Sequence, residues 1–278
     1  MKKIAVITMA RNDNFFLNRW IKYYGEQFGQ ENLYIYLDGE DQTAPKNTNQ
    51  TNIFFVPRIA EHVVKAEKKR LQFLSTKAAE LLKKYDIILG VDADEFLILD
   101  SKTNETLAEY LSKISGKISI SGLGVDVAQH LKKEAALDYD LPFFAQRSYA
   151  VLSSRYTKPS VIFKPVHWGA GFHRIKGHNF YIDKNLYLIH FGSVDYDMII
   201  KKFDDKDFIS TGRVRHIKKR TKLITLVTKK DANEGDKWFS IARILQTLIR
   251  PVYALNKPSM AGWKLVVKIP ERFKNTGI

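Results

Sequence analysis

Short apolar runs alternate with segments of helical periodicity between residues 4 and 91, and this alternation limits the possible folds more than any other feature. Apolar runs occupy residues 4–9, 33–37, 53–56 and 86–91. Residues 15–24 and 65–85, which lie between them, repeat their apolar side chains at helical spacing. Strands separated by helices of this length pair as parallel neighbours with helical crossovers. We therefore predict an α/β fold, a Rossmann-like and mostly parallel sheet flanked by helices.

Polar side chains follow three of these apolar runs. Thr8 and Arg11 end the first run, Asp38 ends the second, and Asp92 and Asp94 follow the fourth. In open parallel sheets, ligands bind at the carboxyl ends of the strands. We therefore expect the three clusters to converge on one edge of the sheet.

The acidic cluster Asp92-Ala93-Asp94 has the composition of a site for a hard cation. Two carboxylates one residue apart at a strand end can hold a divalent metal, while one of them meets a ribose hydroxyl or metal-bound water. The metal would stabilise a pyrophosphate leaving group. A solvated acidic turn is the alternative, but the strand context and the other two clusters favour metal binding.

The three clusters resemble those of the GT-A fold glycosyltransferases, above all family 2 and the family-92-like bacterial group. The resemblance rests on residues 8–13 (TMARND), 36–41 (YLDGED) and 91–94 (VDAD). It implies transfer of a hexose from a nucleotide-sugar, UDP-linked in our expectation, to a surface-glycan, lipopolysaccharide-type or lipid-linked acceptor. The donor-site residues that it implies are Thr8 and Arg11 beside the base, Asp38 accepting the base N–H, Arg70 at the base or phosphate, Asp92 at the ribose and Asp94 at the metal.

The second half of the chain extends the resemblance as far as about residue 200. Residues 155–159 and 167–173 resemble the acceptor-side segment of these enzymes, with Trp168, Gly171 and His173 as acceptor-binding residues. Glycine allows close backbone approach to a ligand, and an indole can stack on the apolar face of a sugar. An ordinary turn around a core tryptophan is the alternative.

His190 ends the apolar run at residues 186–191, and it resembles the histidine that completes the metal site in many GT-A enzymes. The implied cofactor is Mn²⁺ or Mg²⁺, held by Asp94 and His190. A core histidine with satisfied hydrogen bonds is the alternative for a histidine on an apolar strand.

The catalytic base is the point at which the chain departs from the family pattern. Many family 2 enzymes carry a Glu-Asp pair after the acceptor loop, whereas Asp183 is the only acid between residues 171 and 190 here. We take Asp126 as the candidate base, because it ends an extended segment soon after the acidic motif. His173, Asp183 and Asp195 are the other candidates, and the choice between inversion and retention stays open.

The charge of the chain favours polyanionic partners. The 45 Lys and Arg residues exceed the 30 Asp and Glu residues and give a net charge of +15. The basic stretch at residues 213–230 and the amphipathic helix after it suit an anionic membrane surface, and a solvated basic face is the alternative. We place a GT-A-like domain at residues 1–212 and a basic, partly helical extension at residues 213–278.

Several other classes of protein lose support from the sequence. The absence of cysteine excludes disulfides and thiolate chemistry. Neither a signal peptide nor a membrane span is expected, so we predict a cytoplasmic protein, with contact at the inner face of the membrane. P-loop and dinucleotide-binding motifs and nucleic-acid-binding modules are missing. A metal-dependent nucleotidyl or phosphoryl transferase and a basic nucleic-acid-binding protein remain as alternatives, although we do not expect nucleic acid as a partner.

Overall fold

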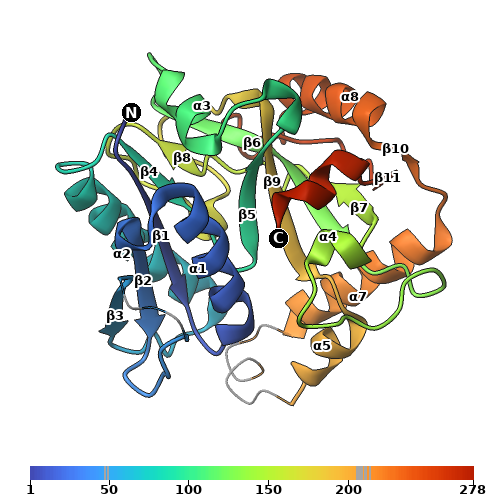
Figure 1. Ribbon diagram of the computed structural model, residues 1–278, viewed down its shortest axis with the longest axis horizontal. Coiled ribbons are helices and arrows are strands. Elements are labelled where there is room, and N and C mark those ends of the chain that lie inside the picture. Colours follow the sequence, from blue (N-terminus) through green and yellow to red (C-terminus); the bar gives the residue numbers. More distant parts are fainter. Residues whose placement is uncertain (47, 49, 205–208, 210–211, 213) are drawn as a thin grey trace.

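The computed structural model describes residues 1–278 except 47, 49, 205–208, 210, 211 and 213 (Figure 1). Its first half alternates strands and helices, which confirms the predicted α/β architecture. The elements of this half are β1 (Ile4–Ala10), α1 (Asn14–Phe28), β2 (Leu33–Asp38), β3 (Asn52–Val56), α2 (Val63–Leu81), β4 (Ile87–Gly90), β5 (Glu95–Leu99), α3 (Leu107–Lys113) and β6 (Ser119–Ala128).

The second half is less regular and contributes shorter helices and further strands. These elements are α4 (Phe143–Gln146), β7 (Tyr149–Leu152), β8 (Val161–Ile162), the 3-10 turn η3 (Ala170–Phe172), β9 (Ile182–Ser193), α5 (Tyr196–Lys201), α7 (Val214–Lys229), β10 (Asn233–Glu234), α8 (Gly235–Leu248), β11 (Leu265–Lys268) and the 3-10 helix η4 (Glu271–Thr276).

The strands of the described residues form one sheet, in which the order β3-β2-β1-β4 is parallel throughout. Antiparallel β8 joins β4 to β6, and the sheet continues through β7 and β11 to β10. β9 runs parallel to β6 and antiparallel to β5. The predicted parallel part thus corresponds to the first four strands, and the second half adds mixed pairing.

The two faces of β1 are covered by different helices, as the alternation of side chains along a strand requires. Val6 packs in the cluster that contains α1, whereas Ile7 packs in the cluster that contains Leu71 and Leu74 of α2. The N-terminal sheet is therefore buried on both faces, which explains why its strands read as continuous apolar runs.

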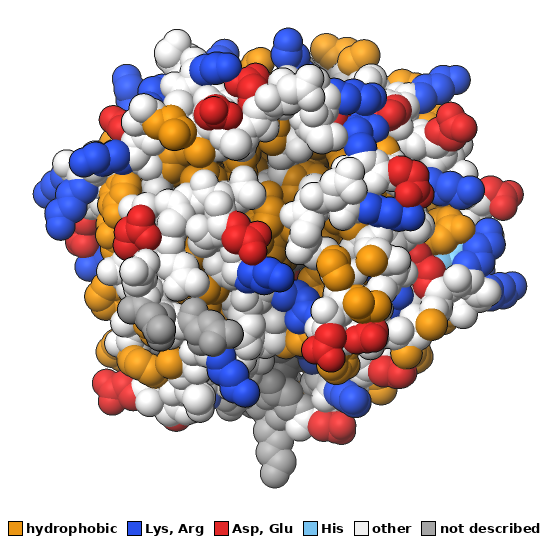
Figure 2. All heavy atoms as spheres, viewed as in Figure 1, with side chains coloured by type: hydrophobic (Ala, Val, Ile, Leu, Met, Phe, Trp, Pro, Cys, Tyr) orange, Lys and Arg blue, Asp and Glu red, His pale blue; other side chains and the backbone are white. Residues whose placement is uncertain are grey.

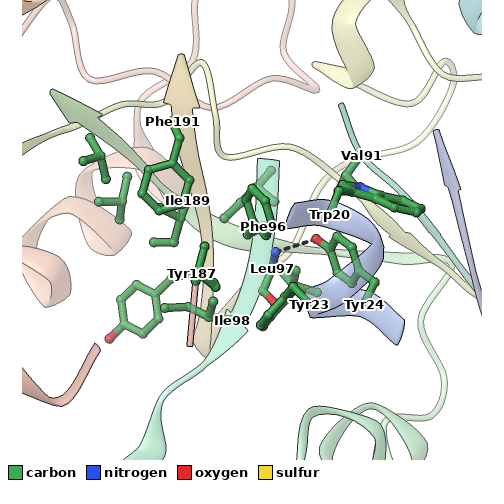
Figure 3. Close-up of a cluster of buried hydrophobic side chains, with 14 of the residues drawn as sticks. Trp20, Tyr23, Tyr24, Val91, Phe96, Leu97, Ile98, Tyr187, Ile189 and Phe191 are labelled. Carbon is green, nitrogen blue, oxygen red and sulfur yellow. Dashed lines mark hydrogen bonds between the residues drawn. The ribbon is translucent and has the colours of Figure 1, made fainter. Parts of the chain in front are cut away.

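Helix α1 also fixes the backbone of β5 (Figure 3). The hydroxyl of Tyr24 accepts a hydrogen bond from the amide of Leu97 at 2.7 Å, and the hydroxyl of Tyr23 donates to the Leu97 carbonyl at 2.7 Å. The ring of Phe96 stacks on Tyr24 with centroids 6.1 Å apart. Because β5 begins at Glu95, these contacts hold the turn that carries the acidic motif.

The C-terminal residues belong to the same sheet and core as the rest of the chain. Strand β11 pairs with β7, and Phe239 and Phe273 lie in the main hydrophobic cluster beside Tyr187 of β9. Residues on both sides of position 212 thus share this sheet and cluster, and the domain boundary near residue 212 stays a prediction. Arg213, the first residue of the predicted extension, lies outside the described residues. In the described part of the chain, no helix has the length and apolarity that crossing a bilayer requires.

Candidate functional site

The acidic motif lies in the tight turn between β4 and β5. The amide of Glu95 donates to the carbonyl of Asp92 at 3.0 Å, which closes the turn. Gly90, the last residue of β4, leaves room for the rings of Trp168 and Phe172, since a Cβ there would lie 2.8 Å and 2.9 Å from them. The turn is therefore fixed from both sides, and the carboxylates project at the carboxyl end of the parallel strands, as predicted.

Asp92 is held by two cations from different parts of the chain. Arg70, on α2, donates from Nη2 to Asp92 Oδ1 at 2.8 Å, and Lys158 donates from Nζ to Asp92 Oδ2 at 2.8 Å. Lys158 is buried and also forms an ion pair with Glu95. Arg70 further approaches the carbonyl of Met9 at 3.4 Å, so it links the end of β1 to the acidic motif.

Asp94 is held by a second pair of cationic groups. Arg220, on α7, donates from Nη2 to Asp94 Oδ2 at 2.9 Å, and His190 Nε2 lies 3.2 Å from the same oxygen. The other ring nitrogen of His190 lies 2.7 Å from Asp126 Oδ1. Tyr156 stacks on the imidazole with ring centroids 3.8 Å apart. The result is a buried Asp126–His190–Asp94 chain that ends at Arg220.

The ion pairs determine the charge states of these groups. Burial alone would lower the pKa of His190, but Asp94 and Asp126 outweigh it and raise the pKa to about 9. Burial likewise opposes ionisation of Asp94, yet His190 and Arg220 bring its pKa below the ordinary value. Burial, opposed by Lys158 and reinforced by Asp92, raises the pKa of Glu95 to about 7. At neutral pH, His190 is thus a cation between two carboxylates.

Mn²⁺ or Mg²⁺ was predicted at Asp94 and His190, and the structure does bring these two residues together. A histidine that ligates a metal uses a neutral ring nitrogen, whereas both nitrogens of His190 face carboxylates. Arg220 also occupies Asp94 Oδ2. Within the described ranges, no group of three or more His, Asp or Glu side chains is placed to hold a metal ion. In this arrangement the donor atoms of Asp94 and His190 are taken up by ion pairs, and the metal stays a prediction.

The predicted nucleoside residues lie at the ends of β1 and β2. The carboxylate of Asp38 accepts from Arg58 Nη1 at 2.8 Å and from the amide of Ile59 at 2.7 Å. Arg11 donates to the carbonyl of Asp38 at 2.8 Å and forms a two-bond ion pair with Asp41. Arg11 therefore connects the two strand ends. A carboxylate has about four lone-pair sites, so Asp38 retains capacity to accept from a ligand N–H.

Thr8 is the exception among the nucleoside residues. It is fully buried within β1, before the polar end of the strand. The pleat of β1 directs its side chain into the protein interior, and the prediction that Thr8 borders the base stays a prediction.

Trp168 of the predicted acceptor segment has the surroundings of a core residue. It is only 3% exposed, its Nε1 donates to the carbonyl of Pro159 at 3.0 Å, and its ring meets Phe172 edge to face. These contacts favour the alternative of a turn around a core tryptophan, and sugar stacking stays a prediction. Gly171 has φ of 62°, in the left-handed region, and a Cβ there would lie 2.9 Å from His173. Half-buried His173 is bonded to the carbonyl of Arg155 at 2.8 Å.

The candidate bases have different surroundings. Asp126 is buried behind His190, to which it is bonded. Asp183 accepts from the hydroxyl of Tyr110 at 2.9 Å, and Asp195 caps α5 by accepting from the Met198 amide at 2.8 Å. The contacts of the last two are structural, which leaves Asp126 and His173 as the candidates on the site side of the sheet.

Sequence reasoning missed Lys158, Tyr156 and Arg220, which complete the site. Lys158 and Tyr156 lie in the segment 155–159 that was assigned to the acceptor side, and no spacing pointed to Asp92 and His190 as their partners. Arg220 stands within a basic stretch that predicted a surface. One trace of this packing in the sequence is Gly192, two residues after His190. A Cβ there would lie 2.4 Å from His190 and 2.7 Å from Arg220, so this packing of the two side chains requires glycine.

The remaining cations do not form one continuous patch on the face that Figure 2 shows, where Lys and Arg side chains are scattered among acidic and neutral ones. Helix α7 buries Ile217, Ile224 and Val227 against the sheet. Its apolar face is therefore covered by protein, and most of its exposed residues are Lys or Arg, as on a solvated basic face.

No family model matches this chain, and no curated protein sequence matches it. Similar solved structures include the mannose-1-phosphate geranyltransferase of Thermus thermophilus, with 12% identity over 45% of this chain and 41% of that one at a TM-score of 0.29. A glycosyltransferase involved in glycosylation of the major capsid of PBCV-1 has 13% identity over 44% of this chain and 50% of that one, at a TM-score of 0.25. CMP:2-keto-3-deoxy-manno-octonic acid synthetase complexed with CTP has 11% identity over 80% and 87% of the two chains, at 0.29.

The chain thus spans half or less of the length of the first two of these structures. Structural similarity at TM-scores of 0.25 to 0.29 does not indicate an activity, which has to be inferred from the residues of the site.

Proposed function

We propose that the protein is a glycosyltransferase that moves a sugar, most simply a hexose from a UDP-sugar, to a glycan or lipid-linked acceptor. One observation carries the proposal. The acidic turn after β4 meets cations from α2, α7 and the 155–159 segment at the same sheet edge as Asp38 and Arg11. Groups suited to binding a nucleotide and cations suited to a leaving diphosphate therefore lie together, which supports the proposal.

The site offers separate groups for the two parts of such a donor. Asp38 has acceptor capacity for the base N–H, and Arg11 lies beside it. Arg70, Lys158 and Arg220 are already concentrated around the acidic turn, and positioned cations stabilise the charge that develops on a departing diphosphate. Since each is held by a carboxylate, its position is set before a ligand arrives.

The Mn²⁺ or Mg²⁺ of the sequence analysis stays a prediction. A metal at Asp94 would compete with Arg220 and with the protonated ring of His190. The base, Asp126, also stays a prediction. Its Oδ1 lies 2.7 Å from His190 Nδ1. An acceptor hydroxyl that reached Asp126 would therefore join the hydrogen-bond chain of Asp126, His190 and Asp94.

Calorimetric titration with UDP tests the proposal on four proteins, with Mn²⁺ and with a chelator in parallel. These are the wild type, Asp94→Asn, Arg220→Ala and Arg215→Ala, an exposed arginine of the same helix that serves as the matched control. We expect Arg220→Ala to weaken UDP binding by about tenfold or more, because a charge-assisted contact is lost. Arg215→Ala should leave binding within about twofold, because an exposed charge contributes little.

Asp94→Asn should abolish sugar transfer, measured as UDP release, while far-ultraviolet circular dichroism and thermal unfolding show an intact fold. Transfer that survives this change would refute a role for Asp94 in the chemistry. Binding of UDP only in the presence of Mn²⁺ would establish the metal, and binding in chelator would assign the charge to the side chains. Absence of binding by UDP and by the other nucleoside diphosphates would contradict the proposed function.

A further inference from the structure

The segment between Ile244 and Trp263 exposes an unusual concentration of large apolar side chains. Among the described residues, eight large hydrophobic side chains are more than half exposed, and only Met1 and Val64 lie outside this segment. Exposed apolar area on this scale is unfavourable in water and marks an interaction surface. The other six are Ile244 (59%), Leu248 (74%), Val252 (102%), Tyr253 (75%), Leu255 (75%) and Trp263 (58%).

The backbone of the segment is shaped by hydrogen bonds and by buried anchors. The amide of Ala254 donates to the Pro251 carbonyl at 3.0 Å, and the amide of Ser259 donates to the Ile249 carbonyl at 3.1 Å. Ala254 and Met260 are buried and fix the loop to the protein. The exposed apolar side chains therefore belong to the last turns of α8 and to the folded segment that follows it.

The charged residues of this part of the sequence all have one sign. Residues 237–270 contain six cations and no Asp or Glu, the cations being Lys237, Arg243, Arg250, Lys257, Lys264 and Lys268. Apolar and aromatic side chains among lysines and arginines match the interface of an anionic bilayer, where tyrosine and tryptophan lie at the headgroup level. A second copy of the chain would place cations opposite cations, with no acidic residue of residues 237–270 to pair with them, which disfavours self-association through this surface.

The segment also touches the chain just after residues 167–173, which were predicted to meet the acceptor. Asn256 donates from its side chain to the carbonyl of Ile175 at 2.7 Å. Burial, and next the cations Lys158 and Lys257, lower the pKa of His173. Lys257 and Lys158, which contacts Asp92, thus act on the same imidazole, and the apolar segment is close to the candidate site.

We propose that residues 244–263 dock on an anionic membrane surface and hold the candidate site next to a lipid-linked acceptor. The docking rests on this segment alone. The choice of a lipid-linked acceptor deepens the proposed function and depends on it. The surface differs from the basic stretch of α7, whose apolar face is already covered.

Sedimentation with vesicles tests the docking on the full chain. Vesicles of phosphatidylcholine alone and of phosphatidylcholine with phosphatidylglycerol are compared, with Val252→Asp/Leu255→Asp as the test variant and Val64→Asp as the control. Val64 is 71% exposed and lies on α2, so its replacement adds the same kind of charge at a distant apolar position. We expect wild type and Val64→Asp to bind the anionic vesicles, and the double variant to lose about tenfold or more in partition.

Leu248→Ser provides a milder variant at the end of α8, in case the double variant unfolds. It should lower the partition by a few-fold, because one exposed apolar side chain is removed from the interface. The fluorescence of Trp263 adds a direct reading: vesicles should shift its emission to shorter wavelength in the wild type, and the Trp263→Phe variant identifies that signal.

Failure of the wild type to bind anionic vesicles would overturn the inference. So would binding of the double variant and of Leu248→Ser that equals binding of the wild type. A dimer in light scattering that the double variant abolishes would assign the surface to a second copy and also overturn it. UDP binding is measured on the same proteins. Vesicle binding without nucleotide binding would contradict the proposed function and leave the docking intact.

Discussion

At the scale of single residues, the site is built from carboxylates whose partners lie far away in the sequence. Asp92 meets Lys158 and Arg70, and Asp94 meets Arg220, 126 positions later. Removing one member of such a buried pair leaves an uncompensated charge, which is more costly than the pair is favourable. Substitutions at these positions therefore need a stability measurement beside every activity measurement.

Trp168 gives a residue-scale prediction that separates the core role from sugar stacking. We expect Trp168→Phe to lower the free energy of unfolding by about 2 kcal/mol, because the buried carbonyl of Pro159 loses its donor. Urea denaturation measures this change, and Trp263→Phe, at an exposed position, should change it by less than about 0.5 kcal/mol. A rise in the acceptor KM with unchanged stability would restore the stacking role.

The sequence was informative about residues wherever a local pattern carried the information. Asp38, Asp92 and Asp94 follow apolar strands directly, and the carboxyl ends of parallel strands must share an edge. Lys158 and Arg220 have no such pattern, because their partners are set by the way β8 and α7 fold back onto the sheet. For Trp168 the sequence left two interpretations open, because a tryptophan followed by glycine is compatible with a core turn and with a binding loop.

At the scale of elements, α7 has two roles in one helix. Its apolar face, with Ile224 at the centre, packs on Ala128 and Val151 of the sheet. One turn before Ile224, Arg220 reaches Asp94. The spacing of about one helical turn places both on neighbouring parts of one face, so the packing of the helix sets the position of the arginine.

Ile224→Ala tests this packing. The side chain is fully buried, and its removal leaves a cavity, so we expect the free energy of unfolding to fall by about 3 kcal/mol. Lys222→Ala is the matched control, since Lys222 is exposed on the same helix and should change the free energy of unfolding by less than about 0.5 kcal/mol. Equal effects of the two changes in urea denaturation would show that α7 does not pack as described.

The elements of the first half could be predicted and those of the second half only in part. Strands β1 to β4 correspond to apolar runs, and helices α1 and α2 repeat apolar side chains at helical spacing. All six elements begin within a few residues of the predicted bounds. Beyond Phe96, strands such as β8 and β10 have two residues each, which is too short for a period to be detected. Their pairing comes from tertiary packing, and so does the inclusion of β11 in the sheet.

At the scale of the whole molecule, an ion-pair cluster joins the C-terminal residues to the strand that carries the site. Arg272 binds Asp100 through Nε and Nη2 at 2.8 Å and 2.9 Å, and it also pairs with Asp236 of α8. Asp100 directly follows β5, which begins at Glu95. The cluster thus connects η4, α8 and β5, and we expect its loss to affect global unfolding.

Arg272→Ala should lower the free energy of unfolding at neutral pH by about 1–2 kcal/mol, because Asp100 loses its cation and keeps the donors of Lys102 and Tyr187. Burial raises the pKa of Asp100, but Arg272 outweighs it and brings the pKa below the ordinary 3.8. A depressed carboxyl pKa stabilises the fold above the unfolded value, and this contribution disappears as pH falls through the folded value. Urea denaturation should therefore show the difference in free energy of unfolding between wild type and Arg272→Ala closing below about pH 4.

Lys274→Ala is the control, because its partner Glu271 is 81% exposed, and it should leave the free energy of unfolding unchanged at every pH. A difference of constant size for Arg272→Ala across this pH range would refute the ion-pair origin.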